Sequence, residues 1–111
     1  MSRIWLALVL TFTTNQAATA LDREQQRGKE LLHTLCARCH AVDETGRSPH
    51  RDAPPFRTLG ERKLYDEDLA RRLQEGLSTI HPDMPTFRFK REEAEAAINY
   101  LKAIQHVDWT K

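Results

Sequence analysis

Two cysteines and a histidine stand together in the segment Cys36-Ala37-Arg38-Cys39-His40. Cys-x-x-Cys-His is the spacing at which haem is attached covalently to a polypeptide. The two thiols can add across the two vinyl groups at one edge of the porphyrin, and the adjoining histidine then lies under the iron. The segment therefore predicts one haem c, bound through Cys36 and Cys39, with His40 as an iron ligand.

Other kinds of site also use closely spaced cysteines. A thioredoxin-like redox pair lies in a β-α-β pattern, which this sequence does not show. A structural zinc site needs four ligands, and the chain has no second cysteine pair to supply them. A disulfide between positions so close together would close a tiny loop and stabilise the fold little. Haem attachment is therefore the interpretation that accounts for the pair.

Met84 is the predicted second axial ligand of the iron. Apart from Met1 it is the only methionine of the chain, and it lies between Pro82 and Pro85. A methionine that filled a gap in the core would be expected on the apolar face of a helix, not in a proline-bracketed loop. His81 is the alternative ligand. The other histidines, which we expect to be solvated or partly packed, are His33, His50 and His106.

Residues 1–20 have the layout of a secretory signal peptide. Arg3 supplies a positive charge, residues 4–12 form an apolar run, and a polar stretch ends in Ala18-Thr19-Ala20. The apolar run is about half of the roughly 20 residues that a membrane-spanning helix needs. We therefore expect cleavage after Ala20, a single domain over residues 21–111, and a periplasmic location.

Charge and size narrow the class of protein further. The chain has 17 Lys and Arg against 16 Asp and Glu, and the loss of Arg3 with the leader balances them. A nucleic-acid binder would need a basic excess to meet phosphate. We therefore expect no nucleic-acid partner, and no stable membrane insertion after signal cleavage. A domain this small buries a limited core and often depends on a cofactor.

Hydrophobic periodicity predicts an all-α fold with three main helices. They span about residues 22–36, 66–75 and 90–105, and Gly76 is the predicted stop signal of the second. Residues 43–63 and 78–89 are expected to be irregular, and no segment is predicted to be a strand. A compact domain rarely carries loops this long without a use for them.

Together these features resemble the class I c-type cytochromes, and more narrowly the short single-haem cytochromes of the bacterial periplasm. The resemblance covers essentially all of residues 21–111 and implies the cytochrome c fold wrapped around one haem. Besides the attachment motif, the segments that carry it are Ala53-Pro54-Pro55-Phe56, His81-Pro82-Asp83-Met84-Pro85-Thr86-Phe87 and the terminal helix ending in Tyr100-Leu101.

The resemblance also implies particular contacts. In that family a glycine eight residues before the first haem cysteine packs on an aromatic residue of the C-terminal helix, and Gly28 and Tyr100 hold these positions here. A loop proline carbonyl accepts a hydrogen bond from the proximal histidine, and either Pro54 or Pro55 can fill this role for His40. Candidates for the haem-propionate partners, by charge alone, are Arg57 and Arg62.

Histidine and thioether ligation suits electron transfer, because the soft sulfur favours ferrous iron and raises the reduction potential. With both axial positions filled the iron offers no site to a substrate, so we expect no enzymatic activity. Redox proteins that donate and accept the electron are expected to dock transiently. Two alternatives stay open: a ligand-binding or sensing haem protein, and a cytochrome subunit of a larger oxidoreductase complex.

Overall fold

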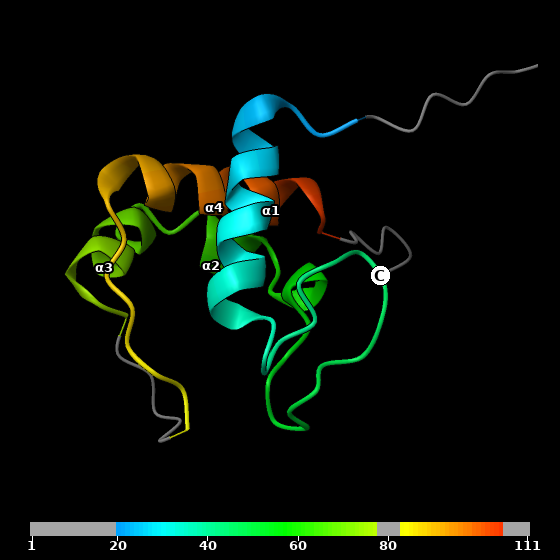
Figure 1. Ribbon diagram of the computed structural model, residues 1–111. Helices are drawn as coiled ribbons and strands as arrows, with labels where there is room; N and C mark the ends of the chain where they lie inside the picture. Colours follow the sequence, from blue (N-terminus) through cyan, green and yellow to red (C-terminus); the bar gives the residue numbers. More distant parts are fainter. Residues whose placement is uncertain (1–19, 78–82, 106–111) are drawn as a thin grey trace, which may run out of the picture.

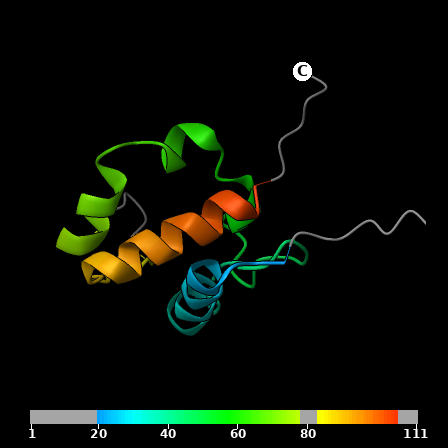
Figure 2. The same ribbon diagram turned by 90° about the horizontal axis from the view of Figure 1, so that it is seen from above.

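Two long helices cross at the centre of the computed structural model, which describes residues 20–77 and 83–105. Helix α1 (Arg23–Cys36) runs down the middle of Figure 1, and α4 (Arg91–Ala103) lies across it, as the view from above in Figure 2 also shows. Between them along the chain come η1 (Phe56–Thr58), α2 (Glu61–Leu64) and α3 (Leu69–Glu75). No strand occurs within these two ranges, and the predicted all-α fold is confirmed.

Several predictions concern residues that lie outside the described ranges. The predicted signal peptide is one of them, except for Ala20, which is exposed. His81, Pro82 and His106 also fall outside. Within the described part of the chain, no helix has the length and apolar character needed to cross a membrane.

The crossing of α1 and α4 depends on Gly28. A Cβ atom at this position would lie 2.0 Å from the Ala96 carbonyl oxygen, a distance that real Cβ atoms do not show, and a tight 3.0 Å from the Ala97 nitrogen. The close approach expected at Gly28 is present, but the nearest atoms are backbone atoms of Ala96 and Ala97 rather than the Tyr100 ring. The Tyr100 hydroxyl is directed to the loop after α1, where it donates a hydrogen bond to the Val42 carbonyl (2.9 Å).

The buried core joins the helices to the loop that follows α1. Tyr100 is 1% exposed and is the largest fully buried side chain among residues 20–77 and 83–105. Around it pack apolar side chains from α1, from the loop, from η1 and α2, and from α4. They are Leu32, Val42, Phe56, Leu64, Ala97, Leu101 and Ile104.

The prediction that residues 43–63 are irregular throughout is wrong, because this stretch contains η1 and the first three residues of α2. Pro55 precedes η1 with φ −59°, the value that its ring fixes and that suits a helix start. Gly60 has φ +80°, which lets the chain turn sharply between η1 and α2. Pro55 and Gly60, which the sequence suggested were loop residues, therefore set the start of η1 and the turn between η1 and α2.

Local hydrogen bonds shift two helix boundaries from their predicted positions. Helix α3 begins at Leu69 rather than Asp66, because Asp66 forms a turn ahead of it. The Asp68 nitrogen donates to Asp66 Oδ1 and the Leu69 nitrogen to the Asp66 carbonyl, both at 3.0 Å. The helix ends at Glu75, and Gly76 follows with φ +102°, as the predicted stop signal requires.

Helix α4 ends at Ala103, two residues before its predicted end, and the Gln105 side chain closes it. Gln105 Nε2 donates to the carbonyls of Leu101 (2.8 Å) and Phe56 (2.7 Å). Its Oε1 accepts from the Gly60 nitrogen (2.9 Å). Gln105 thereby caps α4 and ties it to the loop that carries η1.

Candidate haem-attachment site

The attachment motif lies in the turn that ends α1. The backbone nitrogens of Cys39 and His40 both donate to the Cys36 carbonyl, at 3.1 and 2.9 Å. Both cysteines are free and half-buried. One tight turn therefore holds both thiols and the imidazole of the motif.

Burial raises the pKa of the Cys36 thiol to about 11, and the neighbouring Cys39 adds to the shift. The Cys36 thiol is thus protonated at neutral pH. A catalytic thiol–disulfide pair needs the opposite, because the thiolate is the reactive form and such pairs lower its pKa. The surroundings of Cys36 therefore do not favour an attacking thiolate at this position.

The His40 ring is fixed by one hydrogen bond and one stacking contact. Its Nδ1 atom lies 2.8 Å from the Pro54 carbonyl oxygen, and the Phe56 ring stacks on it with centroids 4.5 Å apart. A carbonyl oxygen only accepts, so Nδ1 carries the proton and Nε2 keeps a lone pair for a metal. This is the arrangement of a metal-ligating histidine held by an outer partner.

Of the two candidate prolines, Pro54 provides the carbonyl that contacts His40. The Pro55 carbonyl instead accepts from the nitrogen (3.1 Å) and the hydroxyl (2.8 Å) of Thr58. The two prolines therefore have separate tasks, since Pro54 orients the imidazole and Pro55 begins η1.

We call residues 37–56 the His40 loop, and its own hydrogen bonds close it. The Ala41 nitrogen donates to Ser48 Oγ (3.0 Å), and the Phe56 nitrogen donates to the Ala41 carbonyl (3.0 Å). The His50 nitrogen donates to the Cys39 carbonyl (3.1 Å). None of these contacts has a periodic signal in the sequence, and sequence reasoning did not find them.

Met84 lies half-buried in a bend between exposed Asp83 and exposed Pro85. We call residues 83–89 the Met84 loop. Its second half is fixed to the end of α3, because the nitrogen of buried Phe89 donates to the Leu73 carbonyl (3.0 Å). Thr86 also packs closely on Gly76, where a Cβ would lie 2.9 Å from Thr86 Cγ2.

The residues around these two loops fit a haem. The donor set combines two free thiols, an imidazole with a free nitrogen and a thioether, which suits haem c with its iron. Helix α3 contains no buried residue. Apolar side chains on α3 and beside it are half-exposed, as expected for a surface that a porphyrin covers. These are Leu73, Leu77, Met84 and Phe87, whereas Leu69 packs against the buried core.

Arg57 uses only part of its guanidinium for hydrogen bonds within the chain. Its Nη2 donates to the Gly46 carbonyl (2.7 Å), whereas its buried Nη1 has no hydrogen-bond partner among the described residues. The structure does not describe the side chain of Arg62. Arg57 thus remains a candidate partner for an anionic group, and its bond to Gly46 also gives it a structural role in the His40 loop.

Two further histidines, which we expected to be solvated or partly packed, each lie close to a carboxylate and stay partly exposed. His33 Nε2 lies 3.0 Å from Asp43 Oδ1, and Lys29 Nζ lies 3.3 Å from the same oxygen. The hydrogen bond from His33 is the main cause that lowers the pKa of Asp43. His50 Nε2 lies 3.6 Å from Asp83 Oδ2 and so connects the two loops.

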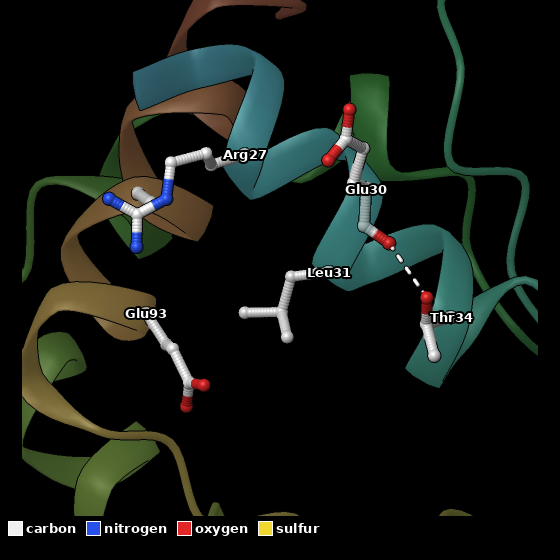
Figure 3. A pocket seen from close by; sticks show the side chains of 6 residues that line it. Arg27, Glu30, Leu31, Thr34 and Glu93 are labelled. Atoms are coloured by element: carbon white, nitrogen blue, oxygen red, sulfur yellow. Dashed lines mark hydrogen bonds between the residues drawn. The ribbon is translucent and has the colours of Figure 1, made fainter. Parts of the chain in front are cut away.

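A separate open pocket lies between α1 and α4 (Figure 3). The Glu93 side chain accepts a hydrogen bond from the Lys90 nitrogen (2.8 Å), and the Thr34 hydroxyl donates to the Glu30 carbonyl of its own helix (3.0 Å). None of the lining residues is a predicted site residue. They are Arg27, Glu30, Leu31, Thr34, Glu93 and Ala96.

The fold and the site define an all-α protein built around a Cys-x-x-Cys-His turn, which is the class of covalent haem proteins. A family model described as cytochrome c matches residues 25–105. The chain therefore belongs to the cytochrome c family, whose members bind haem c covalently with its iron and typically transfer electrons. No curated protein and no solved structure gives a match to the chain.

Proposed function

We propose that this chain is a periplasmic one-electron carrier of class I type, with one haem whose iron is held by His40 and Met84. The observation that carries the proposal is the hydrogen bond between His40 Nδ1 and the Pro54 carbonyl (2.8 Å). It sets the tautomer, holds the ring plane and leaves Nε2 as the ligating atom. An imidazole held in this way keeps its position when the charge on the metal changes.

Met84 is proposed as the second ligand on chemical and positional grounds. Its thioether is a soft donor that favours ferrous iron and raises the reduction potential. Its loop is joined to α3 through Phe89 and Thr86, so the sulfur can be held without a change of fold. The bound haem supplies the one-electron iron couple, and the half-buried apolar side chains around it exclude water.

Docking of redox partners is proposed at the surface around the attachment turn and the Met84 loop. Arg38 and Pro85 are both exposed there. Electron-transfer encounters bury small areas and are short-lived, so a few exposed residues suffice. Export through residues 1–20 would bring the chain to the compartment of its partners.

The test is the optical spectrum of the purified holoprotein with its ferric and ferrous haem. We expect a low-spin ferric spectrum with a methionine–iron charge-transfer band. The Met84→Ala variant should keep its haem attached, lose this band and show a lower reduction potential. The His81→Ala variant is the matched control from the same loop region and should keep the band.

Other outcomes would change the proposal. A high-spin ferric spectrum of the unmodified protein would contradict ligation by Met84 and indicate a ligand-binding or sensing haem protein. Loss of the low-spin spectrum in His81→Ala, with retention in Met84→Ala, would make His81 the ligand. Stable co-purification with an oxidoreductase would indicate that the chain is a cytochrome subunit of a larger complex and not a free carrier.

A further inference from the structure

We propose that His50 is a positioning residue that holds the Met84 loop in place through Asp83. The inference rests on the proposed ligation by Met84. His50 Nε2 lies 3.6 Å from Asp83 Oδ2, and Asp83 directly precedes Met84 in the chain. This contact joins the loop that follows one predicted iron ligand to the loop that carries the other.

The backbone of His50 is fixed relative to the attachment turn. Its nitrogen donates to the carbonyl of Cys39, and its own carbonyl accepts from the Ala53 nitrogen, both at 3.1 Å. The position of His50 therefore follows that of the cysteine that would be bonded to the porphyrin.

The orientation of the His50 ring is fixed as well. The Asp52 nitrogen donates to His50 Nδ1 (3.2 Å). A backbone N–H only donates, so Nδ1 is an acceptor and the proton of the neutral ring lies on Nε2. Nε2 is the nitrogen that faces the Asp83 carboxylate. The distance of 3.6 Å exceeds that of a direct hydrogen bond and suits a water-bridged contact between the Nε2–H group and the carboxylate.

This contact supports the end of the Met84 loop that α3 does not hold. The second half of the loop is joined to α3 by the Phe89–Leu73 hydrogen bond and the close packing of Thr86 on Gly76. The His40 loop and the Met84 loop both reach the end of the molecule at which α1 terminates (Figure 1). Met84 therefore lies between two anchors, and loss of His50 would free one of them.

The expected effect is small because both side chains are partly exposed, His50 by 35% and Asp83 by 74%. We expect the sulfur of Met84 to leave the ferric iron about threefold faster when the contact is removed, in the range that a single hydrogen-bonded contact provides.

The experiment measures the rate of exogenous imidazole binding to the ferric holoprotein, at saturating imidazole, where departure of Met84 limits the rate. The variants are His50→Ala, Asp83→Ala, the double variant, and His50→Gln, which keeps a side-chain N–H donor. The matched control is His33→Ala, which breaks the other histidine–aspartate pair, with Asp43, away from the Met84 loop.

We expect both single variants to accelerate imidazole binding, the double variant to add little to either, and His50→Gln to restore part of the original rate. The His33→Ala control should bind imidazole at the rate of the unmodified protein. If His50→Ala and His33→Ala give the same rate, or if the two single effects simply add, the positioning role is wrong while ligation by Met84 stands. If the unmodified protein lacks the methionine band, both proposals fall.

Discussion

The α1–α4 crossing and the two loops that carry the site are stabilised by different kinds of contact. At the crossing, the Gly28 backbone touches the backbone of Ala96 and Ala97 without room for a methyl group. In the loops, the key contacts are single polar ones, such as His40 with Pro54 and His50 with Asp83. The close packing at the crossing therefore bears on the stability of the fold, whereas the polar contacts bear on where the proposed iron ligands lie.

This difference predicts that substitutions at the crossing change stability, and that substitutions in the loops change iron ligation and potential. Protein interiors are densely packed and respond to one added methyl group. Partly exposed polar pairs contribute at most about 1 kcal/mol to stability, yet they can move a ligand relative to the metal.

The largest stability effect is expected at Gly28. In the Gly28→Val variant the new side chain would overlap the Ala96 carbonyl, which a Cβ would approach to 2.0 Å. The helices would have to separate, and we expect a loss of about 3 kcal/mol or more in the free energy of unfolding, as for severe overpacking. Denaturant unfolding of the holoprotein measures this loss.

Gly60→Ala is the matched control for Gly28→Val. A Cβ at Gly60 meets no atom within 4 Å, and its φ of +80° is the only strain. A left-handed alanine costs about 1 kcal/mol, so this variant should be clearly more stable than Gly28→Val. Equal losses in the two variants would contradict the account of the crossing.

A smaller effect is expected from Tyr100→Phe, which tests the link between the core and the His40 loop. The variant leaves the buried Val42 carbonyl without the hydrogen bond that the Tyr100 hydroxyl donates (2.9 Å). An unsatisfied buried acceptor costs about 1–3 kcal/mol. Denaturant unfolding at neutral pH measures the loss.

The pH dependence of stability provides a second measurement at Tyr100. Burial raises the pKa of Tyr100 from 10.0 to about 12, and the nearby Asp43 and Glu44 carboxylates add to the shift. The folded state thus holds the phenol proton more tightly than the unfolded state. The contribution of the Tyr100 phenol to the free energy of unfolding is complete below pH 10 and is lost as pH rises toward 12. A Tyr100→Phe variant with the same alkaline loss as the unmodified protein would contradict this assignment.

The smallest effect on stability is expected at Asp43, a partly exposed residue of the His40 loop. The hydrogen bond from His33 is the main cause that lowers the pKa of Asp43 below 3.8. The contribution is therefore present above pH 3.8 and is lost as pH falls through the lowered pKa of the folded state. Asp43→Asn should cost less than about 1 kcal/mol at neutral pH and flatten the acid limb of the stability curve. A loss as large as that of Tyr100→Phe would be inconsistent with a surface pair.

Much of this molecule could be predicted from the sequence because its strongest signals are local. The Cys-x-x-Cys-His spacing, the apolar stripe of α4 and the stop signal Gly76 each depend on neighbours within a few residues. The three main helices therefore lie close to their predicted positions. The all-α class and the haem c cofactor, which rested on the same signals, are confirmed by the family match.

What the sequence could not provide depends on contacts between residues far apart in the chain. The choice between Pro54 and Pro55 depends on which carbonyl the folded loop turns toward His40. In the sequence Gln105 looks like an ordinary residue at the end of a helix. In the structure its side chain forms hydrogen bonds with the Phe56 carbonyl and the Gly60 nitrogen. The partnership of His50 with Asp83 likewise exists only once the two loops are folded side by side.

The most direct test of the central claim is whether the pigment stays with the polypeptide under denaturing conditions. We predict that acid-acetone treatment leaves the haem on the unmodified chain, since thioether bonds to Cys36 and Cys39 are covalent. A variant with both Cys36→Ala and Cys39→Ala should release any haem that it binds. Release of the pigment from the unmodified protein, or a mature protein without pigment, would contradict the account.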